Sequence, residues 1–235
     1  MKKLKKTIRK KQDYDEEYFA ARDLLGDHVA NVIENLLKKN KIKTVLDVGP
    51  GTGRLMRYLE SKGYKVKGLD ISPVSAKYSG AIVGSATDMP FKKESFDCVV
   101  GLHIIEHLRE KDGITFINEV HRVLKPNGTI FLLTPNYASP LRYIKGKDWY
   151  GYSDKTHVCF YTPSSLKKLL VSHGFGKVML TFKINLTTLG WPLPAFFEKF
   201  SPKMKYMVNY LLVSTYLGLL RDSLWIGAKK ITPRT

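Results

Sequence analysis

The stretch VLDVGPGTGRL, residues Val45 to Leu55, decides the fold predicted for this 235-residue chain. Its apolar run closes on an acid, Asp47, and three glycines then occupy alternate positions. They are Gly49, Gly51 and Gly53. Glycine adopts positive φ angles without strain and has no side chain, so such a turn brings bare backbone close to a ligand. The pattern therefore predicts a first strand that turns tightly into a helix, whose free N–H groups face the same ligand.

Two phosphate-binding motifs do not match this loop. A G-x-G-x-x-G fingerprint needs glycine at position 54, where the chain has Arg54, and a loop ending in G-K-[ST] is absent. The stretch instead resembles the first motif of class I S-adenosylmethionine-dependent methyltransferases, a D-x-G-x-G-x-G loop that wraps the amino-acid half of the cofactor. The resemblance implies that Asp47 and the three glycines bind S-adenosylmethionine.

A second acid follows at the expected distance. The predicted strand YKVKGLDIS ends at Asp70, 21 residues after Gly49. In nucleotide-binding α/β folds an acid about 20 residues beyond the loop accepts hydrogen bonds from ribose hydroxyls. The simpler alternative is an aspartate that only shapes the turn. We expect Asp70, with the adjoining Ile71, to belong to the cofactor site.

Three further residues complete the predicted cofactor site. The family resemblance implies that Asp88 lies near the adenine amino group and that Met89 offers backbone and an apolar wall. The segment from Asp97 to about Leu102 is an almost unbroken apolar run, which is typical of a parallel strand covered on both faces. Because open α/β sheets bind ligands at the carboxyl ends of their strands, we expect Leu102 and His103 to border the cofactor.

The remaining strand and helix signals predict an α/β fold. The expected architecture is a Rossmann-like, doubly wound sheet of seven strands, mostly parallel with an antiparallel last strand, and helices on both faces. The later strands are predicted at 81–85, 129–136, 176–184 and 223–230. We expect a basic flexible tail at 1–13 and one methyltransferase domain at 14–235. The domain begins with a helix from Tyr14 to about Lys38 and carries insertions at about 137–162 and 185–221.

His103, Glu106 and His107 spell H-x-x-E-H, which also occurs as an inverted zinc-protease motif. Nothing else in the chain supports a protease. Ubiquinone-type O-methyltransferases, which the chain resembles, carry E-x-x-E-H here and are linked to a divalent metal, but His103 replaces the first acid. We therefore expect no metal, a structural Glu106–His107 pair, and a catalytic His103 that faces the cofactor.

His157 lies in DKTHVCFYTP, Asp154 to Pro163, within the first predicted insertion. Methyl transfer to a hydroxyl needs an aligned nucleophile and removal of its proton. Histidine suits that task because its ordinary pKa is about 6.5. We therefore predict a catalytic role for His157 on the acceptor side. The alternative is a histidine that caps the helix starting near Thr162 to Ser164.

The net charge of +18 favours a polyanionic partner, either nucleic acid or an acidic membrane surface. Seven of the first twelve residues are Lys or Arg, with no acid among them. The apolar stretch from Met207 to Leu220 has fourteen residues, short of the roughly 20 needed to cross a bilayer. Our hypothesis is reversible contact with an anionic membrane, whereas a solubilising tail and a packed helix are the simpler explanations.

Two cysteines, Cys98 and Cys159, cannot build a disulfide framework, and an apolar signal segment is not found near residue 1. We expect a cytoplasmic enzyme that uses S-adenosylmethionine to methylate a small acceptor at oxygen, with a lipophilic or membrane-derived acceptor in view. An RNA methyltransferase and a non-catalytic binding module are the open alternatives, and the sequence leaves the oligomeric state open.

Overall fold

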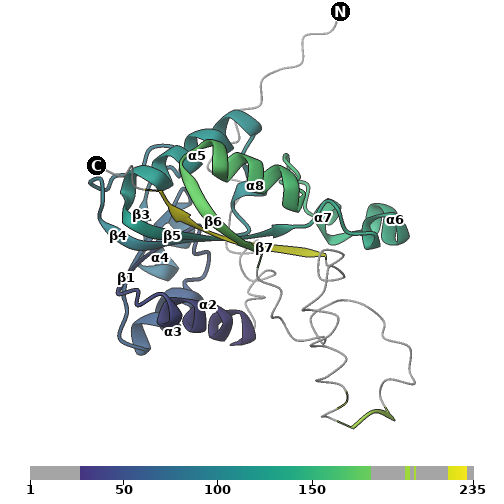
Figure 1. Cartoon of the computed structure of the whole chain (residues 1–235), viewed down its shortest axis with the longest axis horizontal. Helices are drawn as coiled ribbons and strands as arrows, with labels where there is room; N and C mark the ends of the chain where they lie inside the picture. Colours follow the sequence, from purple (N-terminus) through teal and green to yellow (C-terminus); the bar gives the residue numbers. More distant parts are fainter. Residues whose placement is uncertain (1–26, 181–198, 202–203, 205–221, 232–235) are drawn as a thin grey trace, which may run out of the picture.

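The computed structural model describes residues 27–180, 199–201, 204 and 222–231. In this part of the chain seven strands form one sheet in the order β3-β2-β1-β4-β5-β7-β6 (Figure 1). The strands are β1 (Thr44–Val48), β2 (Lys65–Asp70), β3 (Ile82–Val83), β4 (Phe96–Leu102), β5 (Leu124–Pro135), β6 (Phe175–Leu180) and β7 (Ser223–Lys230). The order reverses between β1 and β4, which confirms the predicted doubly wound sheet.

Strand direction also follows the prediction. β1 pairs in parallel with β2 and β4, and β2–β3 and β4–β5 are parallel as well. β7 is antiparallel to both of its neighbours, β5 and β6. The carboxyl ends of β1, β2 and β4 therefore meet at one edge beside the reversal in strand order, which is where open α/β sheets bind ligands.

Helices cover both faces of the sheet (Figure 1). They are α2 (Asp27–Lys39), α3 (Arg54–Ser61), α4 (Pro73–Ser79), η1 (Ile105–His107), α5 (Glu110–Val123), α6 (Leu141–Lys145), η2 (Gly146–Asp148), α7 (Tyr150–Ser153) and α8 (Pro163–Ser172). Local sequence explains several of their ends. α8 begins after Thr162, whose side chain accepts from the Ser165 N–H while the Ser165 hydroxyl bonds back to the Thr162 N–H. Such a reciprocal cap satisfies donors that the first helical turn leaves unpaired.

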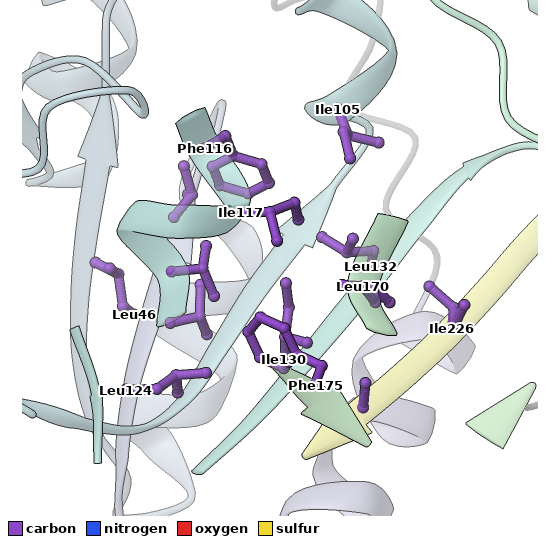
Figure 2. Close-up of a cluster of buried hydrophobic side chains, with 14 of the residues drawn as sticks. Leu46, Ile105, Phe116, Ile117, Leu124, Ile130, Leu132, Leu170, Phe175 and Ile226 are labelled. Atoms are coloured by element: carbon purple, nitrogen blue, oxygen red, sulfur yellow. The ribbon is translucent and has the colours of Figure 1, made fainter. Parts of the chain in front are cut away.

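The core has one layer on each face of the sheet. Alternate residues of a strand point to opposite faces, so Leu46 packs in one cluster and its neighbour Val45 in the other. The first cluster joins the sheet to α5 and α8 through Phe116, Ile117 and Leu170 (Figure 2). The second joins it to α2 and α3. The sheet is thereby held from both sides, which fixes its carboxyl edge.

Four sequence predictions extend beyond what the structure describes, among them the strand at 176–184, which is seen as β6 up to Leu180. The predicted helix from Tyr14 to about Lys38 is seen as α2 from Asp27 on, and its earlier part lies outside the described residues, as does the tail at 1–13. Almost all of the second predicted insertion, at 185–221, lies outside them too. Among the described residues no helix is both long and apolar enough to cross a membrane.

The first predicted insertion, 137–162, contains α6, η2 and α7 and lies beyond the end of β5 (Figure 1). Asp222, just before β7, anchors it. One carboxylate oxygen accepts hydrogen bonds from Ser139 Oγ at 2.9 Å and from Trp149 Nε1 at 3.0 Å, and the other lies 3.2 Å from Lys145 Nζ. Because Trp149 is fully buried and Asp222 nearly so, these bonds set the position of α7 at the edge of the sheet.

Candidate functional site

A cavity of about 490 Å³ opens at the carboxyl ends of β1, β2 and β4. Eight of the predicted site residues line it. They are Asp47, Gly49, Gly51, Asp70, Ile71, Leu102, His103 and His157. Residues far apart in the sequence thus meet around one cavity, at the edge where the strand pattern predicts a ligand.

The glycine loop forms one wall of this cavity. Gly49, Gly51 and Gly53 all have positive φ angles, of 74°, 56° and 77°. A Cβ atom on Gly49 would lie 3.2 Å from Ile104, whereas one on Gly53 would lie 2.6 Å from Ser79. Gly49 and Gly51 line the cavity, but Gly53 caps the start of α3 and lets α3 and α4 approach each other. Its expected role toward the ligand is therefore indirect.

Two buried acids lie under the loop. Asp47 is 2% exposed, and burial together with the charge of Asp70 raises the pKa of Asp47 from 3.8 to about 7. Burial also raises the pKa of Asp70, although hydrogen bonds from Ser75 and Ser72 act in the opposite direction. A cation or a set of hydroxyl donors entering the cavity would stabilise both carboxylates in their charged form.

Asp70 borders the cavity and also shapes the turn that follows β2. It lines the cavity, and its Oδ1 accepts from the Ser72 N–H at 2.8 Å while its Oδ2 accepts from Ser75 Oγ at 2.6 Å. These bonds shape the turn into α4 and fix the carboxylate. Each carboxylate oxygen can accept a further hydrogen bond, so the turn-forming role leaves acceptor capacity for a ligand.

The two residues predicted on the adenine side do not line this cavity. Asp88 is exposed and Met89 is buried, and neither lines the cavity. The Met89 backbone bonds to α5: its N–H donates to Glu119 Oε2 at 2.7 Å and its carbonyl accepts from Arg122 Nη2 at 2.9 Å. On this side Ser85 and Ala86 line the cavity instead.

His103 is held by a fully buried carboxylate. Its backbone has a φ angle of 56°, a region that a non-glycine residue rarely adopts, and its Nδ1 lies 2.8 Å from Glu106 Oε1. The other Glu106 oxygen accepts from Thr134 Oγ1 at 3.0 Å. Burial by itself would raise the pKa of Glu106, but the bond to His103 and the nearby charges of His103 and His107 hold it below its ordinary value.

The Glu106 carboxylate decides which nitrogen of His103 carries the proton. An ionised carboxylate only accepts hydrogen bonds, so Nδ1 of His103 must be the donor and Nε2 is the acceptor nitrogen of the neutral ring. The His103 side chain is 42% exposed and lines the cavity. Glu106 thus bonds to His103, and its charge also favours the protonated form of His107, so the Glu106–His107 pair stays a prediction.

His157 also lines the cavity, and its side chain is only 7% exposed. Its Nδ1 donates to the Gly151 carbonyl at 2.7 Å, and its ring meets that of His107 edge-on with centroids 4.8 Å apart. The alternative reading of His157 as a helix cap is wrong, because Thr162 caps α8. The neighbouring His107 has a pKa that is lowered from 6.5 to about 4, and its burial is the main cause.

Glu106, His107 and His157 could also hold a divalent cation. One potential ligand atom from each lies within 4.8 Å of the others. The Nδ1 atoms of both histidines already bond to Thr156 Oγ1 and the Gly151 carbonyl, an arrangement that presents Nε2 as the electron-pair donor. Both oxygens of Glu106, however, already accept hydrogen bonds from His103 and Thr134.

Sequence reasoning did not single out three further lining residues, Tyr150, Ser153 and Asp154, which border the cavity from α7 and its carboxyl end. Tyr150 donates to the Asp222 carbonyl at 2.7 Å and its ring lies edge-on to His103 with centroids 6.4 Å apart. Their only sequence signal is that they fall in an insertion that follows a central strand. Such insertions commonly carry specificity.

Comparison with known proteins identifies the family of the chain. The family described as "Methyltransferase domain" matches residues 16–179. The ubiquinone biosynthesis O-methyltransferase of Bartonella bacilliformis is 29% identical over 186 residues, which is 72% of this chain and 71% of that protein. The chloroplastic tocopherol O-methyltransferase of Arabidopsis thaliana is 36% identical over 111 residues, or 41% of this chain.

Other relatives differ in the atom that their names specify. The ajmaline N-methyltransferase of Rauvolfia serpentina is 34% identical over 110 residues, 41% of this chain. The matches span 31% of the tocopherol enzyme and 37% of the ajmaline enzyme, about a third of each relative.

A solved structure confirms the fold. The crystal structure of a SAM dependent methyltransferase from Archaeoglobus fulgidus superposes with a TM-score of 0.64 at 21% identity, covering 92% of this chain and all of that one. Family match, glycine loop and sheet order lead to one conclusion. The chain belongs to the class I S-adenosylmethionine-dependent methyltransferase family.

Proposed function

We propose that this chain transfers the methyl group of S-adenosylmethionine to a hydroxyl oxygen of a small, lipophilic acceptor, with His103 as the general base. The observation that carries the proposal is the fixed His103, whose Nδ1 is bonded to the buried Glu106 while its ring lines the cavity. The names of two relatives, which specify O-methylation in tocopherol and ubiquinone biosynthesis, support the acceptor class.

The residues around the cavity fit the cofactor. S-adenosylmethionine, when bound, supplies an activated methyl group on a positively charged sulfur, together with an ammonium group and two ribose hydroxyls. Asp47 and Asp70 are buried acids with raised pKa values, and a nearby cation or hydroxyl donors would stabilise the charged form of each. A Cβ atom at Gly49 would lie a tight 3.2 Å from Ile104, and the positive φ angle of Gly49 would strain any other residue. The cofactor can therefore approach the backbone of the glycine loop closely on this side of the cavity.

The chain's own chemistry is proton removal and positioning. Nε2 of His103 accepts the proton of the acceptor hydroxyl, and the Glu106 carboxylate stabilises the imidazolium that results. Thr134 holds the second oxygen of Glu106, so the carboxylate cannot rotate away. His157 and Tyr150 face the same cavity and would orient the acceptor. Burial of Glu106 makes its charge effective because little water screens it.

The test uses S-adenosylmethionine with a trideuterated methyl group, the purified full chain and a small-molecule extract. Mass spectrometry should find an extract component that gains one labelled methyl group, and fragmentation should place it on oxygen. Label on nitrogen or carbon, or only in the nucleic-acid fraction, would overturn the assignment.

The role of His103 has its own test on the acceptor found in this way. His103→Gln should lower kcat by about 10²–10⁴-fold with unchanged cofactor affinity, because a general base contributes that much. Thr134→Val is the matched second variant, since it removes only one bond to Glu106, and it should lower kcat less. Equal turnover in wild type and His103→Gln would remove His103 from the chemistry.

A further inference from the structure

The helix α6 carries two strongly exposed apolar side chains next to each other. Tyr143 is 74% exposed and Ile144 is 78% exposed, the highest values among the large hydrophobic residues that the structure describes. Their neighbour Leu141 is buried. Scattered single apolar residues are normal on a protein surface, but an adjacent pair at the end of a projecting segment indicates a contact surface (Figure 1).

This pair is held in place. The Arg142 guanidinium lies between the rings of Tyr137 and Tyr143, 4.0 and 4.1 Å from their centroids, and its Nη1 donates to Tyr152 at 3.3 Å. Lys145, which directly follows Ile144, donates a hydrogen bond from Nζ to Asp222, just before β7. The outward position of Tyr143 and Ile144 is therefore a fixed feature of the fold, maintained by cation–π contacts and an ion pair.

The surroundings of the pair are basic. Segment 137–162 holds four Lys or Arg residues against two Asp, on a chain of net charge +18. Lys147 and Lys155 are exposed. This charge fits an anionic partner, and the exposed Ile144 needs an apolar one. A bilayer with acidic headgroups meets both requirements, and tyrosine is typical of the boundary between headgroups and hydrocarbon.

We propose that the α6 tip, defined as Tyr143, Ile144 and Lys147, docks on an anionic lipid bilayer. Tyr143 and Ile144 enter the headgroup boundary, and Lys147 contacts the acidic headgroups. Tyr150 and Ser153, in the same insertion, line the cavity, so docking brings the acceptor wall close to the membrane. The proposal stands apart from the acceptor chemistry above and assigns the contact to other residues than the basic tail or the stretch at 207–220.

Vesicle flotation of the full chain tests the proposal. The probes are vesicles of phosphatidylcholine alone and vesicles containing about one quarter phosphatidylserine, at low and at high salt. The wild-type chain should float with the acidic vesicles and detach as salt screens the headgroups. The variant Tyr143→Ser/Ile144→Gln should bind about ten- to hundredfold more weakly, the range that loss of a buried apolar side chain predicts.

Ile82→Gln is the matched control, because Ile82 is 42% exposed on β3 at the opposite edge of the sheet. It should float like the wild type. Calorimetric titration with S-adenosylmethionine should show equal affinity in all three proteins, which verifies folding. Undiminished flotation of the double variant would overturn the proposal. So would retention by single-stranded RNA without vesicle binding, or a dimer in sedimentation that the double variant abolishes without any vesicle binding.

Discussion

Asp47→Asn should change how stability depends on pH. The folded pKa of Asp47, about 7, lies above its ordinary value of 3.8 because the carboxyl is buried next to Asp70. Between about pH 4 and pH 7 the folded chain therefore keeps a proton that the unfolded chain has lost. The contribution of this carboxyl to the unfolding free energy is fully present below pH 4 and is lost as pH rises through about 7. At 1.36 kcal/mol per pH unit the whole loss is about 4 kcal/mol.

The assay is urea unfolding without cofactor, followed by circular dichroism at pH 5 and pH 8. Over that interval Asp47 should lower the unfolding free energy of the wild type by about 3 kcal/mol, whereas the Asn variant lacks this contribution. Asp70 titrates in both proteins, so the difference between them reports on Asp47. If the two proteins show the same change between pH 5 and pH 8, the carboxyl is already charged below pH 5 and the reasoning fails.

The proton on Asp47 should also affect the binding of the cofactor. A cationic ligand beside Asp47 favours the charged carboxylate, so binding below pH 7 must release a proton. We expect the affinity of the wild type for S-adenosylmethionine to fall by up to tenfold per pH unit below pH 7. Calorimetry in buffers of different ionisation enthalpy measures the released proton directly. In Asp47→Asn this release should disappear, even if the affinity itself is lower.

Three further predictions concern the site. Asp70→Ala should weaken S-adenosylmethionine binding by several-fold to a hundredfold in a titration, because a hydrogen bond to a charged group contributes about 1.5–3 kcal/mol; unchanged affinity would remove Asp70 from the site. His157→Ala should lower turnover with nearly intact cofactor affinity, and equal turnover would exclude the predicted role. Dialysis against a chelator should leave turnover unchanged, because Glu106 already accepts two hydrogen bonds and His103 provides the base. A loss of turnover on dialysis that a divalent metal restores would contradict this.

Sequence periodicity predicted the central strands well because they are apolar runs, as the strand over Asp97 to Leu102 illustrates. The expected turn at Asn127 is instead a residue with a φ angle of 60° inside β5, which begins at Leu124, before the predicted start at 129. The position of Met89 could not be predicted in this way. It depends on hydrogen bonds to Glu119 and Arg122, some thirty residues later, that only the packing of α5 creates.

The candidate site likewise has residues that sequence patterns predict and residues whose positions depend on tertiary packing. The motif pointed to Asp47, near the end of β1, and spacing pointed to Asp70, the last residue of β2, and both line the cavity. The bond between Glu106 and His103 was not predicted, because it depends on the positive φ angle of His103, which lies between β4 and η1 and has no sequence signal. Tyr150 has no local signal at all. Its position depends on Asp222, more than seventy residues later, which no pattern in the insertion reveals.

The position of β7 between β5 and β6 affects how the chain folds while it is being synthesised. This strand emerges from the ribosome after β5 and β6, yet it lies between them, and β6 joins the sheet through it. Until it arrives, β5 presents a bare edge, the kind of surface that promotes aggregation. Asp222, which fixes the first insertion, arrives with it. A nascent chain can therefore form the glycine loop early, but the cavity wall that contains Tyr150 is fixed only after β7 has emerged.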